Sequence, residues 1–150
     1  MNRFMLLLHV VGVVVWVGGM FFAHFALRPS VASWGAPERL RLMQGVLKRF
    51  FTAAAIAVVL ILLSGVALIG LMGGMKTVGL YVHLMLGIGL AMMAVFVHLY
   101  INLLPRLSRA VQAEDWPAGG TALGKIRALV HMNFWLGCIV IVVAMLKIGI

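Results

Sequence analysis

The sequence holds five histidines, and all of them lie within or at the rims of long apolar segments. His9 and His24 stand 15 residues apart in the first segment, and His83 and His98 repeat that spacing in the third. In an α-helix this spacing separates two side chains by about 22 Å along the axis and by about 60° around it. Ionisable residues inside a membrane are costly and commonly mark a functional site. The histidines therefore indicate a ligand or cofactor site rather than a plain membrane anchor.

The direction of each segment sorts the histidines into two layers of depth. The first and third segments run the same way, so we expect His9 and His83 near the outer face of the membrane. His24 and His98 then lie near the inner face. The fourth segment runs the opposite way and brings His131 into the inner layer. We expect His9 to pair with His83, and His131 to pair with His98 or His24.

Two layers of imidazoles predict haem as the principal hypothesis, because neutral imidazole ligates haem iron and bundle helices supply facing ligands. The hypothesis is one or two haem b groups that carry electrons, with a quinol or another redox partner. His9, His83, His98 and His131 are the expected metal ligands. Small residues would leave room for a flat macrocycle, and arginines would pair with its propionates. The full set expected to bind the cofactor is His9, His24, His83, His98, His131, Gly12, Gly87, Arg28, Arg106 and Arg127.

Copper is the alternative ligand. The chain has 11 methionines, and thioether sulfur together with imidazole suits Cu(I). The side chains that we expect to converge near the outer face are Met1, Met5, His9, Met72, Met75, His83 and Met85. We expect Met20, Met92, Met93 and Met132 to lie elsewhere. A copper transport or resistance protein with His/Met sites therefore stays open.

The composition predicts the elements that must position these residues. The chain is 65% hydrophobic and 10% charged, against about 45–50% and about 25% in soluble proteins. Four stretches reach the length of about 20 apolar residues that spans a bilayer: residues 4–27, 51–72, 78–104 and 126–146. We expect an all-α, integral membrane, up-down-up-down four-helix bundle, with residues 1–150 as a single transmembrane domain. A surface helix is expected around residues 38–43, a tight turn at Gly73-Gly74, and a break at residues 116–120.

The formal net charge of +9 is explained by orientation. Lys and Arg mark the cytoplasmic side of a membrane protein, and nine of the twelve lie in the connections 28–50 and 105–125 or at the segment edge beside them. We therefore expect both termini outside, in a multi-pass protein of the bacterial inner membrane that contacts lipid. No basic face with interleaved aromatic residues indicates nucleic-acid binding. A homodimer is compatible with the pattern.

The positions of the carboxylates do not indicate an enzyme that uses acid–base catalysis. Glu38, Glu114 and Asp115 are the only three, and all lie in the connections between spans. Catalytic residues therefore stay unknown, and a membrane oxidoreductase remains open.

Several short motifs carry a resemblance to a known family. Leu8-His9-Val10-Val11-Gly12 with Trp16-Val17-Gly18-Gly19, Leu27-Arg28-Pro29, Tyr81-Val82-His83 and Leu104-Pro105-Arg106 resemble the CopD family of bacterial inner-membrane proteins. The resemblance covers nearly the whole chain and implies copper handling. The chain is also similar in size to HemJ-type protoporphyrinogen oxidases, which likewise open with a Leu-His helix. That more distant similarity implies a protoporphyrinogen oxidase-like membrane enzyme as a further alternative.

Overall fold

Four long helical spans make up the computed structural model, which describes residues 2–147. Each span is long and apolar enough to cross a membrane, as predicted: Arg3–Ser30, Ala36–Leu71, Leu80–Gln112 and Trp116–Leu146. The first span consists of α1 (Arg3–Phe21), the π-helical turn η1 (Phe22–Leu27) and α2 (Arg28–Ser30). The second is α3 (Ala36–Leu71). The third consists of α4 (Leu80–His98), the π-helical turn η2 (Leu99–Leu103) and α5 (Leu104–Gln112), and the fourth is α6 (Trp116–Leu146).

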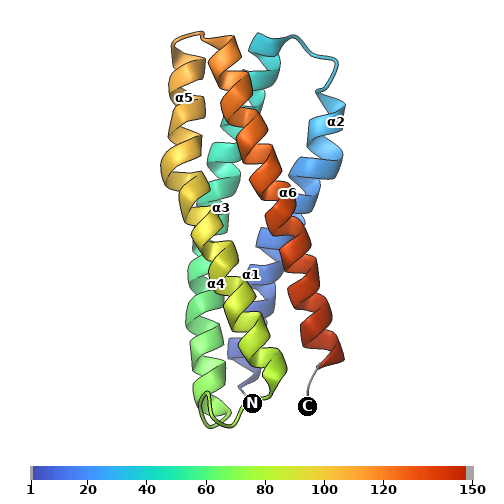
Figure 1. Cartoon of the computed structure of the whole chain (residues 1–150), viewed down its shortest axis with the longest axis vertical. Coiled ribbons are helices and arrows are strands. Elements are labelled where there is room, and N and C mark those ends of the chain that lie inside the picture. Colours follow the sequence, from blue (N-terminus) through green and yellow to red (C-terminus); the bar gives the residue numbers. More distant parts are fainter. Residues whose placement is uncertain (1, 148–150) are drawn as a thin grey trace.

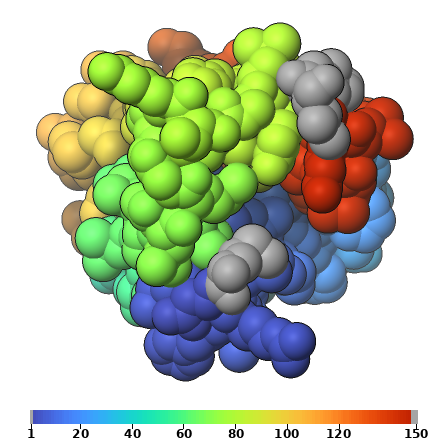
Figure 2. Space-filling model, turned by 90° about the horizontal axis from the view of Figure 1, so that it is seen from below, coloured from blue at the N-terminus to red at the C-terminus, as the bar shows by residue number. Residues whose placement is uncertain are grey.

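The spans run up, down, up and down along one long axis (Figure 1). The start of α1, the α3–α4 turn and the end of α6 lie together at one end, which Figure 2 shows face-on. We call it the outer end, following the charge distribution. The opposite, inner end carries the α2–α3 loop and the α5–α6 turn. The all-α four-helix prediction is confirmed.

The helices continue further into the inner connections than predicted. Residues 38–43 do not form a separate surface helix, because α3 runs unbroken from Ala36 with a proline in its first turn. The expected break at residues 116–120 is likewise the first turn of α6, where Asp115 Oδ1 accepts from the Ala118 N–H at 3.1 Å. Proline is well suited to the first turn of a helix, because the N–H group that it lacks would have no hydrogen-bond partner within the helix there. The predicted Gly73-Gly74 turn is confirmed, with φ of 96° and 93°.

Both π-helical turns lie next to prolines that the sequence analysis did not connect with them. Pro29 follows η1 closely, and Pro105 follows η2. A proline inside a helix removes one backbone hydrogen bond and its ring clashes with the carbonyl four residues earlier. The helix relieves this by widening locally, and such π-bulges are frequent at functional sites. His24 lies inside η1 and His98 directly precedes η2.

Packing between the spans is uneven. α1 packs mainly on α3, whereas α4 and α5 pack mainly on α6. At mid-height the Phe96 ring stands edge-on to Trp16 and to Phe51, with centroid distances of 5.9 and 5.7 Å. In the outer half, α4 makes little contact with α1 or α3, although only a short turn joins it to α3. A cavity remains there.

Candidate functional site

The outer half of the bundle encloses a largely apolar cavity of about 420 Å³ that all four spans line. Among the described residues, His9 is the single histidine of its lining, and Lys147 is its one charged group. The chemically distinctive lining residues are His9, Met72, Tyr81, Met85, Met92, Met93 and Lys147.

The hydrogen bonds of His9 fix its chemistry. Its Nδ1 lies 3.1 Å from the Ile61 carbonyl oxygen and 3.1 Å from the Ser64 hydroxyl oxygen. The Ser64 hydroxyl donates to the Leu60 carbonyl, and both oxygens near His9 then act as acceptors. This pattern assigns the proton of neutral His9 to Nδ1. The lone pair on Nε2 remains available to a ligand, as in protein metal sites whose histidines are held by a backbone carbonyl.

Gly65 makes room for the His9 ring. A Cβ added at Gly65 would stand 3.2 Å from His9 Cε1 and 3.5 Å from Nδ1. Ser64 beside it is a buried polar residue with 2% of its surface exposed. Neither residue was predicted to belong to the site, although a Ser-Gly pair inside an apolar helix is a signal for the close approach of another side chain.

The methionines converge differently from the prediction. Met72 and Met85 line the cavity as expected, whereas Met5 and Met75 do not. Met92 and Met93, which we expected to lie elsewhere, also line it. Met85 and Met93 are two turns apart on α4, so they share one face with Gly89 between them. Met1 lies outside the described residues.

The structure does not bring His9 and His83 together. His83 is exposed, does not line the cavity, and has its Nδ1 3.2 Å from the Gly79 carbonyl. His98 is also exposed, with Nδ1 3.3 Å from Asn102 Nδ2. Gly87 between them is exposed, with nothing within 4 Å of an added Cβ. This stripe of α4 therefore faces away from the bundle.

Of the two inner pairings that we expected, the structure forms the one with His24. The rings of His24 and His131 lie 4.4 Å apart between centroids and 34° apart in plane, which is a tilted stack. The Trp135 indole N–H donates to His131 Nε2 at 3.2 Å, and His131 Nδ1 is buried without a hydrogen-bond partner. His24 lies in η1, which contacts α6, so the widened turn carries one member of this pair.

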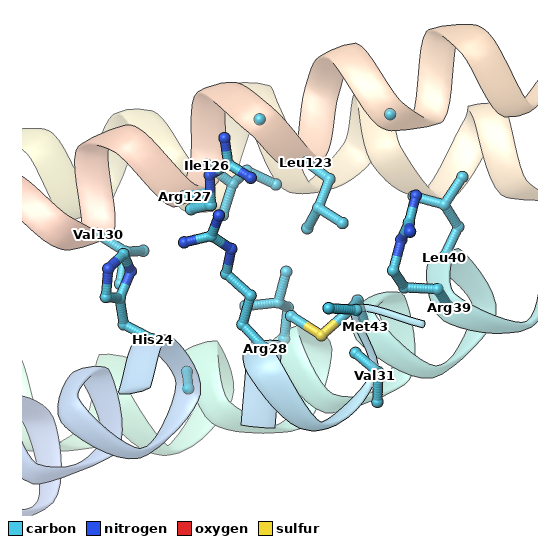
Figure 3. A pocket seen from close by; sticks show the side chains of 15 residues that line it. His24, Arg28, Val31, Arg39, Leu40, Met43, Leu123, Ile126, Arg127 and Val130 are labelled. Carbon is cyan, nitrogen blue, oxygen red and sulfur yellow. The ribbon is translucent and has the colours of Figure 1, made fainter. Parts of the chain in front are cut away.

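Beside the His24–His131 pair lies a second cavity, of about 320 Å³, at the inner end (Figure 3). Two of the predicted arginines, Arg28 and Arg127, line it. Arg39, which the sequence analysis did not select, also lines it. Arg106 is exposed and does not. An arginine cluster thus forms at the predicted depth, with Arg39 in place of Arg106.

Gly12 serves helix packing. A Cβ there would meet Ile61 Cγ1 at 2.7 Å and the Ala57 carbonyl oxygen at 3.1 Å. The absence of a side chain lets α1 approach α3 closely, as small residues commonly do in membrane bundles. Gly12 does not line the outer cavity.

Residues 2–147 contain no group of three or more His, Cys, Asp or Glu side chains that could hold a metal ion. A hard or borderline metal would need such a group. The donor set that the outer cavity does offer, one imidazole with thioethers, is soft, and soft donors select Cu(I).

Fold and site together define a multi-pass membrane protein with a soft-donor cavity in its outer half. The sequence profile described as "Copper resistance protein D" (CopD) matches residues 44–147. The chain belongs to the CopD family, and it is a multi-pass inner-membrane protein related to copper resistance. No curated protein and no solved structure matches it.

Proposed function

We propose that this protein binds Cu(I) in the outer cavity, with His9 and methionine thioethers as ligands, and exchanges it at the outer end of the bundle. The observation that carries the proposal is that His9, whose hydrogen bonds are made through Nδ1, lines a cavity that four methionines also line. Copper is the cargo of the site.

The softness of the donors supports copper in its reduced state. Thioether sulfur binds Cu(I) well and binds Zn²⁺, Mg²⁺ or Ca²⁺ poorly. Met85 and Met93, on one face of α4, line the cavity together with His9 of α1. Met72, 40% exposed at the end of α3, lies nearer the outer surface and is a candidate first contact for an incoming ion.

Close packing at mid-height favours exchange at one end over conduction through the bundle. On the first span, the residues that line the outer cavity end at Val17 in α1, and those that line the inner cavity begin at Ala23 in η1. Met20 lies between them with 2% of its surface exposed. The Trp16, Phe51 and Phe96 rings pack together at this depth. Protein interiors packed in this way leave few voids larger than water.

The histidine geometry favours copper over haem. Axial imidazoles must face one another across the iron with the macrocycle between them. His24 and His131 instead stack directly, at 4.4 Å between centroids. His83 and His98 lie on the exposed face of α4. Among the described residues of one copy, His24, His83, His98 and His131 therefore form no pair that faces across a macrocycle, as bis-histidine ligation requires.

The test is an anaerobic Cu(I) titration of the detergent-purified protein against a chromogenic Cu(I) chelator. We expect one Cu(I) per chain. Replacing His9 by alanine should weaken binding at least tenfold, because the imidazole is the strongest donor of the set. Met85→Leu and Met93→Leu preserve volume, and each should weaken binding severalfold.

Matched controls lie outside the cavity. His83→Ala removes an exposed histidine at similar depth, and Met132→Leu removes a methionine of α6 that is 42% exposed. Both should bind Cu(I) within twofold of the unchanged protein. Equal affinity in His9→Ala and His83→Ala would overturn the proposal. So would a Soret band with no copper bound after expression with haem supplied.

A further inference from the structure

The inner cavity has a charged side and an apolar side. Arg28, Arg39, Arg127 and His24 supply its polar groups. No carboxylate belongs to its lining, as far as residues 2–147 show. The rest of the lining is apolar or glycine, from α3, α6 and the end of the first span: Ala23, Val31, Ala32, Leu40, Met43, Leu47, Gly120, Leu123, Gly124, Ile126 and Val130.

The three guanidinium groups that line the inner cavity come from three different helices. Figure 3 shows Arg28 rising from α2 toward Arg127 on α6, with Arg39 at the other side of the cavity on α3. Arg28 and Arg127 thus place two positive charges on the same side of the cavity. Like charges held together without a counterion are unfavourable. An anion in the cavity would remove this repulsion.

Membrane orientation alone does not account for the convergence. Orientation requires basic residues on the inner side, and Arg106 and Arg109 meet that requirement from exposed positions. The one ion pair among the described residues is Arg41 with Glu114, at 3.2 Å and well outside the cavity lining. Arg28, Arg39 and Arg127 thus line a concave site with no protein carboxylate within it.

We infer that the inner cavity binds an amphiphilic anion, with a phosphate or carboxylate head group held by the arginines and a hydrocarbon body against the apolar wall. Arg28 and Arg127 supply forked N–H donors, which suit both head groups. His131, whose ring stacks on that of His24, has a buried Nδ1 without a hydrogen-bond partner. The site is separated from the outer cavity by the mid-height core, so the inference does not depend on copper binding.

The experiment measures thermal unfolding in a neutral detergent with three added probes: dodecyl phosphate, dodecanoate and inorganic phosphate. We expect the two amphiphilic anions at 100 µM to raise the unfolding temperature by several degrees, because a ligand that binds only the folded state stabilises it. Inorganic phosphate at the same concentration should shift it by less than one degree. An equal shift with inorganic phosphate would overturn the amphiphile assignment.

Arginine variants locate the effect. In Arg28→Gln and Arg127→Gln the shift induced by dodecyl phosphate should fall by at least half. The unfolding temperature without ligand should stay the same or rise, because each variant removes one of two positive charges that repel each other. Arg127→Lys should recover part of the shift, and Arg39→Gln gives an independent variant if either of the others fails to fold. Arg106→Gln is the control, at the same end but outside the cavity, and should respond like the unchanged protein.

Native mass spectrometry of the protein extracted from membranes distinguishes the sources of the anion. A phospholipid mass retained by the unchanged protein and lost from the Arg28→Gln/Arg127→Gln double variant identifies a membrane lipid. Another acidic amphiphile with the same dependence identifies a ligand that is not a lipid. Retention that is the same in both proteins contradicts the inference.

Discussion

At the scale of single residues, the candidate site depends on which nitrogen of His9 carries the proton. The Ile61 carbonyl and the Ser64 hydroxyl both lie 3.1 Å from Nδ1 and hold the proton there. The sequence predicts that His9 lies in the outer layer, but it does not predict these partners. They come from α3, which has no histidine, and its Ser64-Gly65 pair indicates a close approach without showing which side chain approaches. A serine and a glycine in an apolar helix are common enough to serve packing alone.

The same scale shows why part of the histidine arrangement was predictable. Depth follows from counting residues along a helix, so His24 and His131 were placed in one layer correctly. To predict which side of a helix faces the bundle, the sequence must show a polar face. α4 is apolar all round, and such a helix does not show which side faces the bundle. His83 and His98 were therefore expected to face the interior of the bundle, whereas they lie on its exposed surface.

Gly65 gives a prediction about ligand orientation. A valine there would push the His9 ring away, since even a Cβ at this position stands 3.2 Å from Cε1. Groups that orient a metal ligand are commonly worth about 10–100-fold in affinity. We expect Gly65→Val to weaken Cu(I) binding by about tenfold in the chelator titration. Gly70→Val on the same helix, where nothing lies within 4 Å of the added Cβ, should leave the affinity unchanged. Equal losses in both variants would show that the ring does not need this space.

At the scale of elements, prolines and glycines decide where the spans bend and how closely they pack. The four spans and the Gly73-Gly74 turn follow from hydropathy and turn chemistry. The π-helical turns do not, because a Leu-Arg-Pro or Leu-Pro-Arg stretch is equally typical of a helix end. Here the helix ends at Ser30, directly after Pro29, but continues past Pro105 to Gln112. His24, which stacks on His131, lies inside the widened turn before Pro29.

The contact between α1 and α3 gives a prediction about stability. At Gly12 a side chain would meet Ile61 Cγ1 at 2.7 Å and a backbone oxygen at 3.1 Å. Overpacking of this kind typically costs about 1–3 kcal/mol. Gly12→Leu should therefore lower the free energy of unfolding by about that amount, measured by titration with a denaturing detergent. Gly18→Leu on the same helix has open space around the added Cβ and serves as the control. A stable Gly12→Leu protein would mean that α1 and α3 do not approach as closely as described.

At the scale of the whole molecule, the bundle separates two sites of different chemistry. The outer cavity offers soft donors and the inner cavity offers cations, with the Trp16, Phe51 and Phe96 rings between them. Hydropathy predicts the bundle, but not the cavities. The outer cavity lies where α4 packs on α6 and not on α3, which is a matter of side-chain fit that no periodicity records. This arrangement also brings Met92 and Met93 to the outer cavity.

The charge distribution gives a prediction about orientation. Nine of the twelve basic residues lie in or directly beside the inner connections, so the α3–α4 turn should face outward. In a Cys138→Ser background, a membrane-impermeant maleimide applied to intact cells should label Lys76→Cys in that turn. It should not label Ser33→Cys in the α2–α3 loop until the cells are opened. The opposite labelling pattern would invert the bundle and place the methionine cavity on the cytoplasmic side.

The measurement that tests the central claim most directly is X-ray absorption at the copper edge of the Cu(I)-loaded protein. The account predicts one nitrogen scatterer from His9 together with sulfur scatterers from methionines of the outer cavity. The nitrogen contribution should disappear in His9→Ala and persist in His83→Ala. A first shell of nitrogen and oxygen without sulfur, or a spectrum that is unchanged in His9→Ala, would contradict a Cu(I) site in this cavity.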